Sequence, residues 1–209
     1  MLKHWKLPNG FHVLLSPVHD TKSITVLVLI RVGSRYETPH LNGVSHFVEH
    51  LVFKGTKKRP STLHISQELD RLGASYNAFT TKDHTGFYVK VSSRYTEIAM
   101  DIVSDIVQNA QFPAAEVERE RTVIHEEINM YEDNPLMHVT DMLEYALYGK
   151  TSFLGQNIAG PKSVISDVSR ADILKFWNTY YRPGNMALVL AGHITEESAH
   201  QMVKKYFTG

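Results

Sequence analysis

The most apolar run of the sequence is Ser23-Ile24-Thr25-Val26-Leu27-Val28-Leu29-Ile30-Arg31-Val32, and Gly33 ends it. Its Val, Ile and Leu side chains favour a β-strand, because branched side chains pack well on a pleated surface. The run is much shorter than the ~20 apolar residues that a membrane-spanning helix needs. A nearly continuous apolar strand is typical of the buried middle of a sheet. We therefore expect it to be the central strand of a globular domain.

Further strands are predicted on both sides of this run. Residues 5–7 and 11–15 flank Asn9-Gly10, which is a strong signal for a tight hairpin. Residues 75–80 and 85–91 form a second hairpin around Lys82-Asp83, and residues 186–191 form a last strand. Hairpins pair their strands in antiparallel fashion, so the sheet should be largely antiparallel.

Helices are predicted between these strands, at residues 41–53, 62–72, 95–109, 114–131, 139–148, 170–180 and 196–206. Ser61 and Ser169 are the expected N-caps of two of them, and Gly73 ends the first of these. The Met and aromatic residues of segments 95–109 and 139–148 recur at the spacing of core-facing helices. Residues 149–161 are predicted as a Gly-containing loop. We find no repeat or linker and expect one α+β domain over residues 1–209.

Composition excludes several functions. The 209 residues hold 22 basic and 22 acidic side chains, so no basic surface for nucleic acid is expected. The absence of cysteine excludes disulfides, thiolate metal sites and cysteine nucleophiles. The first residues lack the apolar stretch of a signal peptide, so we expect a cytoplasmic protein without a membrane span.

Candidate catalytic chemistry concentrates in Gly43-Val44-Ser45-His46-Phe47-Val48-Glu49-His50-Leu51. The pattern His-x-x-Glu-His places His46 and His50 one helical turn apart, so that both imidazoles can reach one metal ion. Glu49 lies beside the same point and can accept a proton from water. The pattern is the inverted form of the His-Glu-x-x-His zinc motif. It predicts a catalytic zinc site, which needs a third protein ligand.

A less specific interpretation is that these polar residues form the solvent face of an amphipathic helix. Leu41, Val44, Phe47, Val48 and Leu51 fall on one apolar stripe, and the three polar residues fall opposite. The motif and the helical wheel leave both interpretations open.

The acidic segment 115–131 offers a third ligand. Its buried stripe is predicted to contain Val117, Ile124, Ile128 and Tyr131. Glu120 and Glu127 lie at the edge of this stripe, whereas Glu126 points away from it. A carboxylate directed toward a core is costly unless it is paired or bound to a metal. Glu127 and Glu120 are therefore candidates, with structural salt bridges as the alternative, a stronger one for Glu120 than for Glu127.

Six segments together resemble the pitrilysin or insulinase class of zinc peptidases, and its processing-peptidase-like branch in particular. They run in family order and cover nearly the whole chain. The segments are Arg31-Val32-Gly33-Ser34-Arg35-Tyr36-Glu37, residues 46–56, Leu72-Gly73-Ala74-Ser75-Tyr76-Asn77-Ala78-Phe79-Thr80, residues 118–128, Gly155-Gln156-Asn157-Ile158-Ala159-Gly160, and Tyr181-Arg182-Pro183-Gly184-Asn185-Met186.

This resemblance implies site roles. His46, His50 and Glu127 would bind one Zn²⁺ per chain, and Glu49 would be the general base of a zinc endopeptidase. Glu120 would be an accessory glutamate near the site. Asn77, Ala78 and Phe79 would lie on an edge strand that binds an extended peptide substrate through its backbone.

The resemblance also implies a second half. Members of this family usually carry two related α/β halves that close like a clamshell, and this chain matches the N-terminal, catalytic one. We expect a complementary C-terminal half, a partner chain or a homodimer to complete the site. Two other functions are open: a non-catalytic assembly subunit, whose relatives typically lose the metal motif, and a metal lyase with a similar motif, whose chemistry relies on cysteine.

Overall fold

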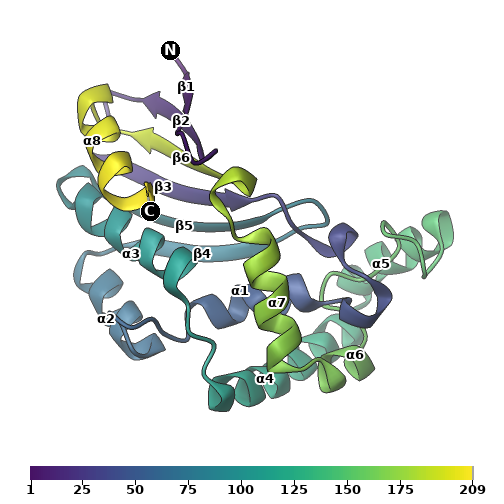
Figure 1. The fold of residues 1–209 in the computed structure, drawn as a ribbon. Coiled ribbons are helices and arrows are strands. Elements are labelled where there is room, and N and C mark those ends of the chain that lie inside the picture. Colours follow the sequence, from purple (N-terminus) through teal and green to yellow (C-terminus); the bar gives the residue numbers. More distant parts are fainter. Residues whose placement is uncertain (209) are drawn as a thin grey trace.

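A computed structural model of the chain describes residues 1–208 and contains a six-stranded sheet in the order β1-β2-β6-β3-β5-β4 (Figure 1). The strands are β1 (Lys3–Lys6), β2 (His12–Pro17), β3 (Ser23–Ile30), β4 (Ser75–Thr80), β5 (Thr85–Ser92) and β6 (Met186–Gly192). Both predicted hairpins form, and β2 and β6 are the one parallel pair in this sheet. The prediction of an α+β fold with a largely antiparallel sheet is confirmed.

Eight α-helices accompany the sheet within the described residues. They are α1 (Val44–Val52), α2 (Thr62–Arg71), α3 (Thr96–Asn109), α4 (Ala114–Asp133), α5 (Pro135–Tyr148), α6 (Lys162–Asp167), α7 (Arg170–Tyr180) and α8 (Glu196–Phe207). Ser61 and Ser169 cap α2 and α7 as predicted, by accepting hydrogen bonds from the backbone N–H groups of His64 and Asp172. None of the helices in residues 1–208 is long and apolar enough to cross a membrane.

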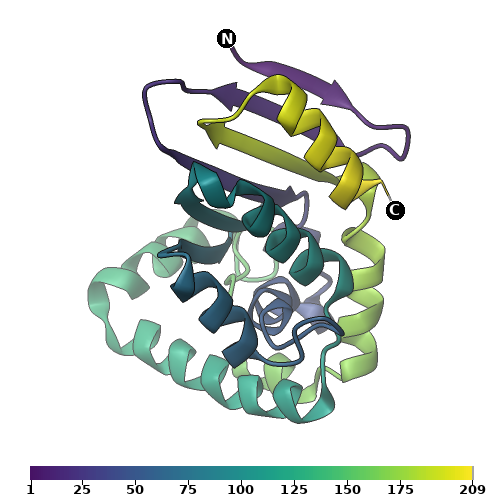
Figure 2. The same ribbon diagram turned by 90° about the vertical axis from the view of Figure 1, so that its left-hand side faces the viewer.

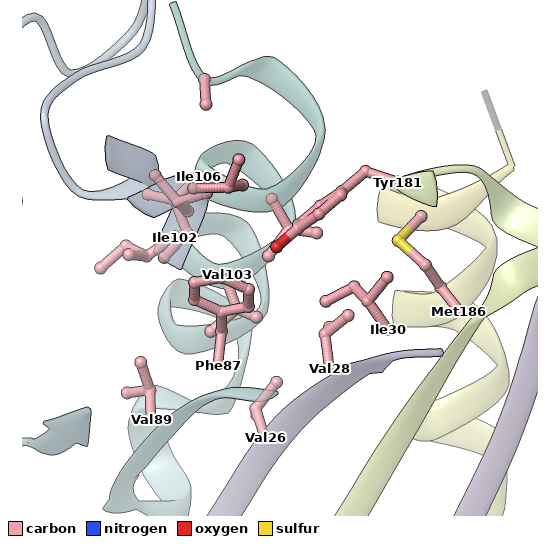
Figure 3. Packing of buried hydrophobic residues seen from close by; sticks show 14 of the residues in the cluster. Val26, Val28, Ile30, Phe87, Val89, Ile102, Val103, Ile106, Tyr181 and Met186 are labelled. Atoms are coloured by element: carbon pink, nitrogen blue, oxygen red, sulfur yellow. The ribbon is translucent and has the colours of Figure 1, made fainter. Parts of the chain in front are cut away.

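The predicted central strand lies inside the sheet, between β6 and β5. It ends at Ile30 rather than Val32, and its side chains are fully buried on one face only, the face of Val26, Val28 and Ile30. On that face, Figure 3 shows these residues with Phe87 of β5 opposite the side chains of α3. Figure 2 shows α3 and α8 side by side across the sheet.

Helix α1 lies among the other elements, in contact with β4, α4 and α7. It begins at Val44, three residues later than predicted, because a short 3₁₀ turn occupies Pro39–Leu41 and Gly43 has a left-handed backbone with φ 98°. A Cβ at Gly43 would lie 2.5 Å from the carbonyl oxygen of Ala159, so the glycine also permits a close backbone approach.

Helix α5 differs most from the sequence expectation. Its apolar spacing predicted a core helix over residues 139–148, but the helix starts at Pro135 and none of its residues is buried. Figure 1 shows α5 at the side of the molecule, beyond α4 and α6. Exposed apolar side chains on α5 are those of Leu136, Met137, Val139, Met142, Leu143, Leu147 and Tyr148. Helix α6, in a stretch for which no helix was predicted, is a further difference.

Candidate metal centre

The start of α1 is fixed by a buried carboxylate. Glu37 accepts hydrogen bonds from the backbone N–H groups of Gly43 and Ser45, both at 2.7 Å, and from the Asn42 amide at 3.1 Å. These contacts satisfy N–H groups of the first turn, which have no partner inside a helix. They also set where the helix begins, and therefore where the residues of its motif lie.

Three side chains from α1 and α4 converge at one point. The Nε2 atoms of His46 and His50 are 3.2 Å apart, and Oε2 of Glu127 lies 3.6 Å from the first and 3.3 Å from the second. Tetrahedral zinc with bonds of about 2.0–2.2 Å places its ligand atoms roughly 3.3–3.6 Å apart. The spacing of the three atoms fits that geometry, and two imidazoles with a carboxylate are a donor set that zinc accepts in catalytic sites.

The solvent-face interpretation of the motif is wrong. His46 is 8% exposed, and the side chain of His50 is 19% exposed. Both rings contact carboxylates of α4. On α4, Glu127 is half-buried and Glu126 is exposed, as the helical wheel predicted.

Glu120 supports the site from behind. Its Oε2 lies 3.0 Å from Nδ1 of His50, and its Oε1 lies 2.6 Å from Nζ of Lys54. The structural salt bridge considered from sequence is thus present, and the same carboxylate also orients a histidine. A carboxylate on the second ring nitrogen fixes the tautomer and direction of a metal-binding imidazole.

Glu49 is close to the three converging atoms but is not one of them. The hydroxyl of Thr80, the last residue of β4, donates a hydrogen bond to its Oε2 at 2.5 Å. Burial raises the pKa of Glu49, and the Thr80 hydrogen bond partly offsets that shift. A carboxyl group with a raised pKa beside a metal position is suited to accept a proton near neutral pH.

In the metal-free site the pKa values of the two histidines are shifted in opposite directions. Burial, with the nearby His50, lowers the pKa of His46 to about 4. Burial also acts to lower the pKa of His50, but hydrogen bonds to Glu120 and Glu127 outweigh it and raise the value to about 9. At neutral pH the metal-free site therefore holds a proton on His50, which a metal ion would have to displace.

A cavity of about 650 Å³ opens at this point. Asn77, Ala78 and Phe79 line it from β4, which is the last strand of the sheet and has one unpaired edge. The structure therefore places the predicted peptide-binding residues beside the metal position.

The cavity has walls that sequence reasoning missed. Tyr131 was predicted to be buried, but its side chain is exposed enough to line the cavity. The opposite wall comes from α5 and from the loop that contains Asn157, Ile158 and Ala159. Residues 155–160 were predicted as part of a loop and match the family, but not as a wall of the cavity. The polar residues Asp141 and Glu144 of α5 were the available signal for the other part of this wall.

Comparisons with known proteins identify the family to which this fold belongs. Residues 12–162 match the family model "Insulinase (Peptidase family M16)", and residues 167–209 match "Peptidase M16 inactive domain". The fold is thus that of a peptidase-family domain. The chain belongs to the insulinase family, peptidase family M16.

Several relatives carry names that specify the chemistry. The chain is 36% identical over 207 residues to the uncharacterized zinc protease YmxG of Bacillus subtilis, covering 99% of the chain and 50% of the relative. It is 38% identical over 201 residues to the mitochondrial-processing peptidase subunit beta of Rattus norvegicus, covering 96% and 40%. A solved protease from Helicobacter pylori superposes with a TM-score of 0.91 at 26% identity, covering 99% and 50%. The chain spans about half or less of the length of these relatives.

Proposed function

We propose that this chain carries the catalytic site of a zinc-dependent endopeptidase. The observation that carries the proposal is the convergence of His46, His50 and Glu127 at zinc-like spacing, with Glu49 beside them. Zinc bound there would supply the Lewis acidity that polarises a peptide carbonyl and acidifies water. Glu49 then accepts the proton of the attacking water and returns it to the leaving amine.

The proposed substrates are extended peptides or unfolded segments. Only an extended chain can add to the free edge of β4 through backbone hydrogen bonds, and such binding tolerates many side chains. Asn77, Ala78 and Phe79 are the residues that we assign to this contact. Their position on the cavity wall would bring a bound backbone next to Glu49.

We also propose that a second domain completes the site. The relatives are about twice as long as this chain or more, and the chain covers only 45% of a solved structure described as the first half of the periplasmic protease PqqL. The exposed apolar side of α5 supports this, because contiguous apolar surface commonly marks an interface. The partner would be a complementary C-terminal half or a separate chain, with a second copy of this chain as the alternative.

A non-catalytic role is the second candidate. The match to an "inactive domain" model over residues 167–209 favours it. We prefer the catalytic role, because the two histidines and both site carboxylates are present and lie together.

The substitution Glu49→Gln separates the two roles. The variant should keep its zinc, because Glu49 is not among the three converging groups. In an assembly with a complementary half that cleaves a quenched-fluorescence peptide, its activity should fall by roughly 100-fold or more. Glu126→Gln, the same change on an exposed residue, is the control. An active Glu49→Gln enzyme would refute the assignment of the base, and an inactive wild-type assembly with bound zinc would favour the non-catalytic role.

A further inference from the structure

Lys82 connects three segments that surround the cavity. It lies in the turn between β4 and β5, two residues after the end of the strand assigned to peptide binding. Its Nζ lies 2.7 Å from Oε2 of Glu144 on α5 and donates to the backbone oxygen of Gln156, also at 2.7 Å. The Lys82 side chain is only 16% exposed. The ammonium group of Lys82 thus connects the β4–β5 turn with α5 and with the loop of residues 155–160.

Helix α5 depends on such polar contacts for its position. It packs along α4, but none of its own residues is buried. Besides the Lys82 pair, the Asn157 amide donates to Oδ2 of Asp141 at 2.6 Å. The loop is held in turn by the Asn42 amide, which donates to the backbone oxygen of Asn157 at 2.9 Å. A helix with few buried apolar contacts opens at low free energy, so each polar contact to its inner side has a large relative effect.

We propose that Lys82 is a positioning residue that holds α5 and the 155–160 loop as the wall of the peptide site opposite β4. Glu144, Asp141 and Asn157 all line the same cavity as the metal centre. When the Lys82 contacts are broken, the wall moves away from β4 and the site no longer holds an extended chain closely. The assignment rests on the proposed peptidase function for its effect on substrate, but the contacts themselves belong to the chain alone.

A mere surface ion pair would not have this effect. Exposed pairs contribute little to stability, because water and salt screen them. The Lys82 and Glu144 side chains are 16% and 29% exposed, and the ammonium also satisfies a backbone carbonyl. Hydrogen bonds to a charged group are the stronger kind, and removing one partner leaves the other group without compensation.

Hydrogen exchange of the 209-residue chain tests the proposal. In Lys82→Met, amides of residues 135–148 and 155–160 should exchange about 3- to 10-fold faster, with those of α3 unchanged. Lys57→Met is the matched control, since Lys57 is exposed and forms no ion pair within residues 1–208. Lys82→Arg should restore slow exchange, because it keeps the charge and the donors. Unchanged α5 exchange in Lys82→Met, or an equal rise in α3, would overturn the proposal.

Glu144→Gln approaches the same contact from the helix and remains available if Lys82→Met does not fold. It should also speed exchange in α5, and the double variant should add little to either single one. Additive effects on exchange would show that the two residues act separately, and would overturn the proposal that the Lys82–Glu144 contact positions α5. In an active assembly, Lys82→Met should raise KM for an extended peptide more than it lowers kcat, with zinc content unchanged. A wild-type protein that binds no zinc would instead contradict the proposed function and leave the exchange results as the test of Lys82.

Discussion

Replacing the third proposed ligand, Glu127→Gln, should remove most of the stabilisation that zinc gives to the fold. Oε2 of Glu127 is the one carboxylate atom among the three converging donors, 3.3 Å from His50 Nε2 and 3.6 Å from His46 Nε2. A ligand that binds only the folded state stabilises the fold by about 2.7 kcal/mol when its free concentration is 100 times the dissociation constant, and we take this for zinc and the wild-type chain. Loss of a residue that only hydrogen-bonds to a metal ligand lowers metal affinity by about 10- to 100-fold. Loss of a direct ligand should therefore lower zinc affinity by at least about 100-fold. The variant would then gain only about 0.4 kcal/mol at the same zinc concentration.

Urea unfolding with and without zinc measures this difference of about 2.3 kcal/mol. The matched control is Glu126→Gln, the same chemical change at the neighbouring, exposed position of α4. It should retain the wild-type response to zinc. Equal zinc stabilisation of both variants would show that Glu127 is not a ligand and that the convergence seen in the structure serves another purpose.

The site and the start of α1 give three further predictions. The pKa of His50 is about 9 in the metal-free chain, so one proton must leave this ring when zinc binds. Zinc affinity should therefore rise about tenfold per pH unit between pH 7 and 8.5. A chelator competition assay that finds no pH dependence would contradict a protonated His50 paired with Glu120 and Glu127. The same raised pKa means that the His50 contribution to metal-free stability is complete below about pH 6.5, the unfolded value, and is lost as the pH rises through 9. Gly43→Ala should destabilise the chain by more than about 2 kcal/mol and weaken zinc binding, since φ is 98° and the new Cβ would lie 2.5 Å from the Ala159 oxygen. Gly73→Ala is the control, because Gly73 also has a positive φ of 61° but an added Cβ would meet no other atom within 4 Å. It should lower the free energy of unfolding by about 1–2 kcal/mol and leave zinc binding unchanged. Equal losses of stability in the two variants would show that the contact with Ala159 is unimportant.

Local signals in the sequence were sufficient for most of the elements. Asn9-Gly10 and the Ser61 and Ser169 caps act within a few residues, so their structures follow from short-range chemistry. The same holds for the choice of Glu127 over Glu126, because both lie on one helix whose buried stripe could be found from apolar spacing. The side of α4 on which the candidate third ligand lies was therefore predictable from its helical wheel, whereas the wheel of α1 left open whether His46 and His50 face solvent.

The features that could not be predicted depend on contacts between distant segments. The spacing of α5 resembles that of a core helix, and nothing within residues 135–148 shows that its apolar side chains stay exposed in this structure. Tyr131 lies on an apolar stripe whose last turn extends past the core into the cavity. The contacts of Lys82 with Glu144 and Gln156 join residues 62 and 74 positions apart, which no local pattern can reveal. The cavity walls formed by α5 and by residues 155–160 were missed for this reason.

The central claim is that His46, His50 and Glu127 bind zinc. The most direct measurement is the metal content of the purified chain after dialysis against micromolar zinc, compared with that of a His46→Ala, His50→Ala double variant. We predict close to one zinc per wild-type chain and essentially none in the double variant. A wild-type chain that retains no zinc, or a double variant that retains as much as wild type, would contradict the account.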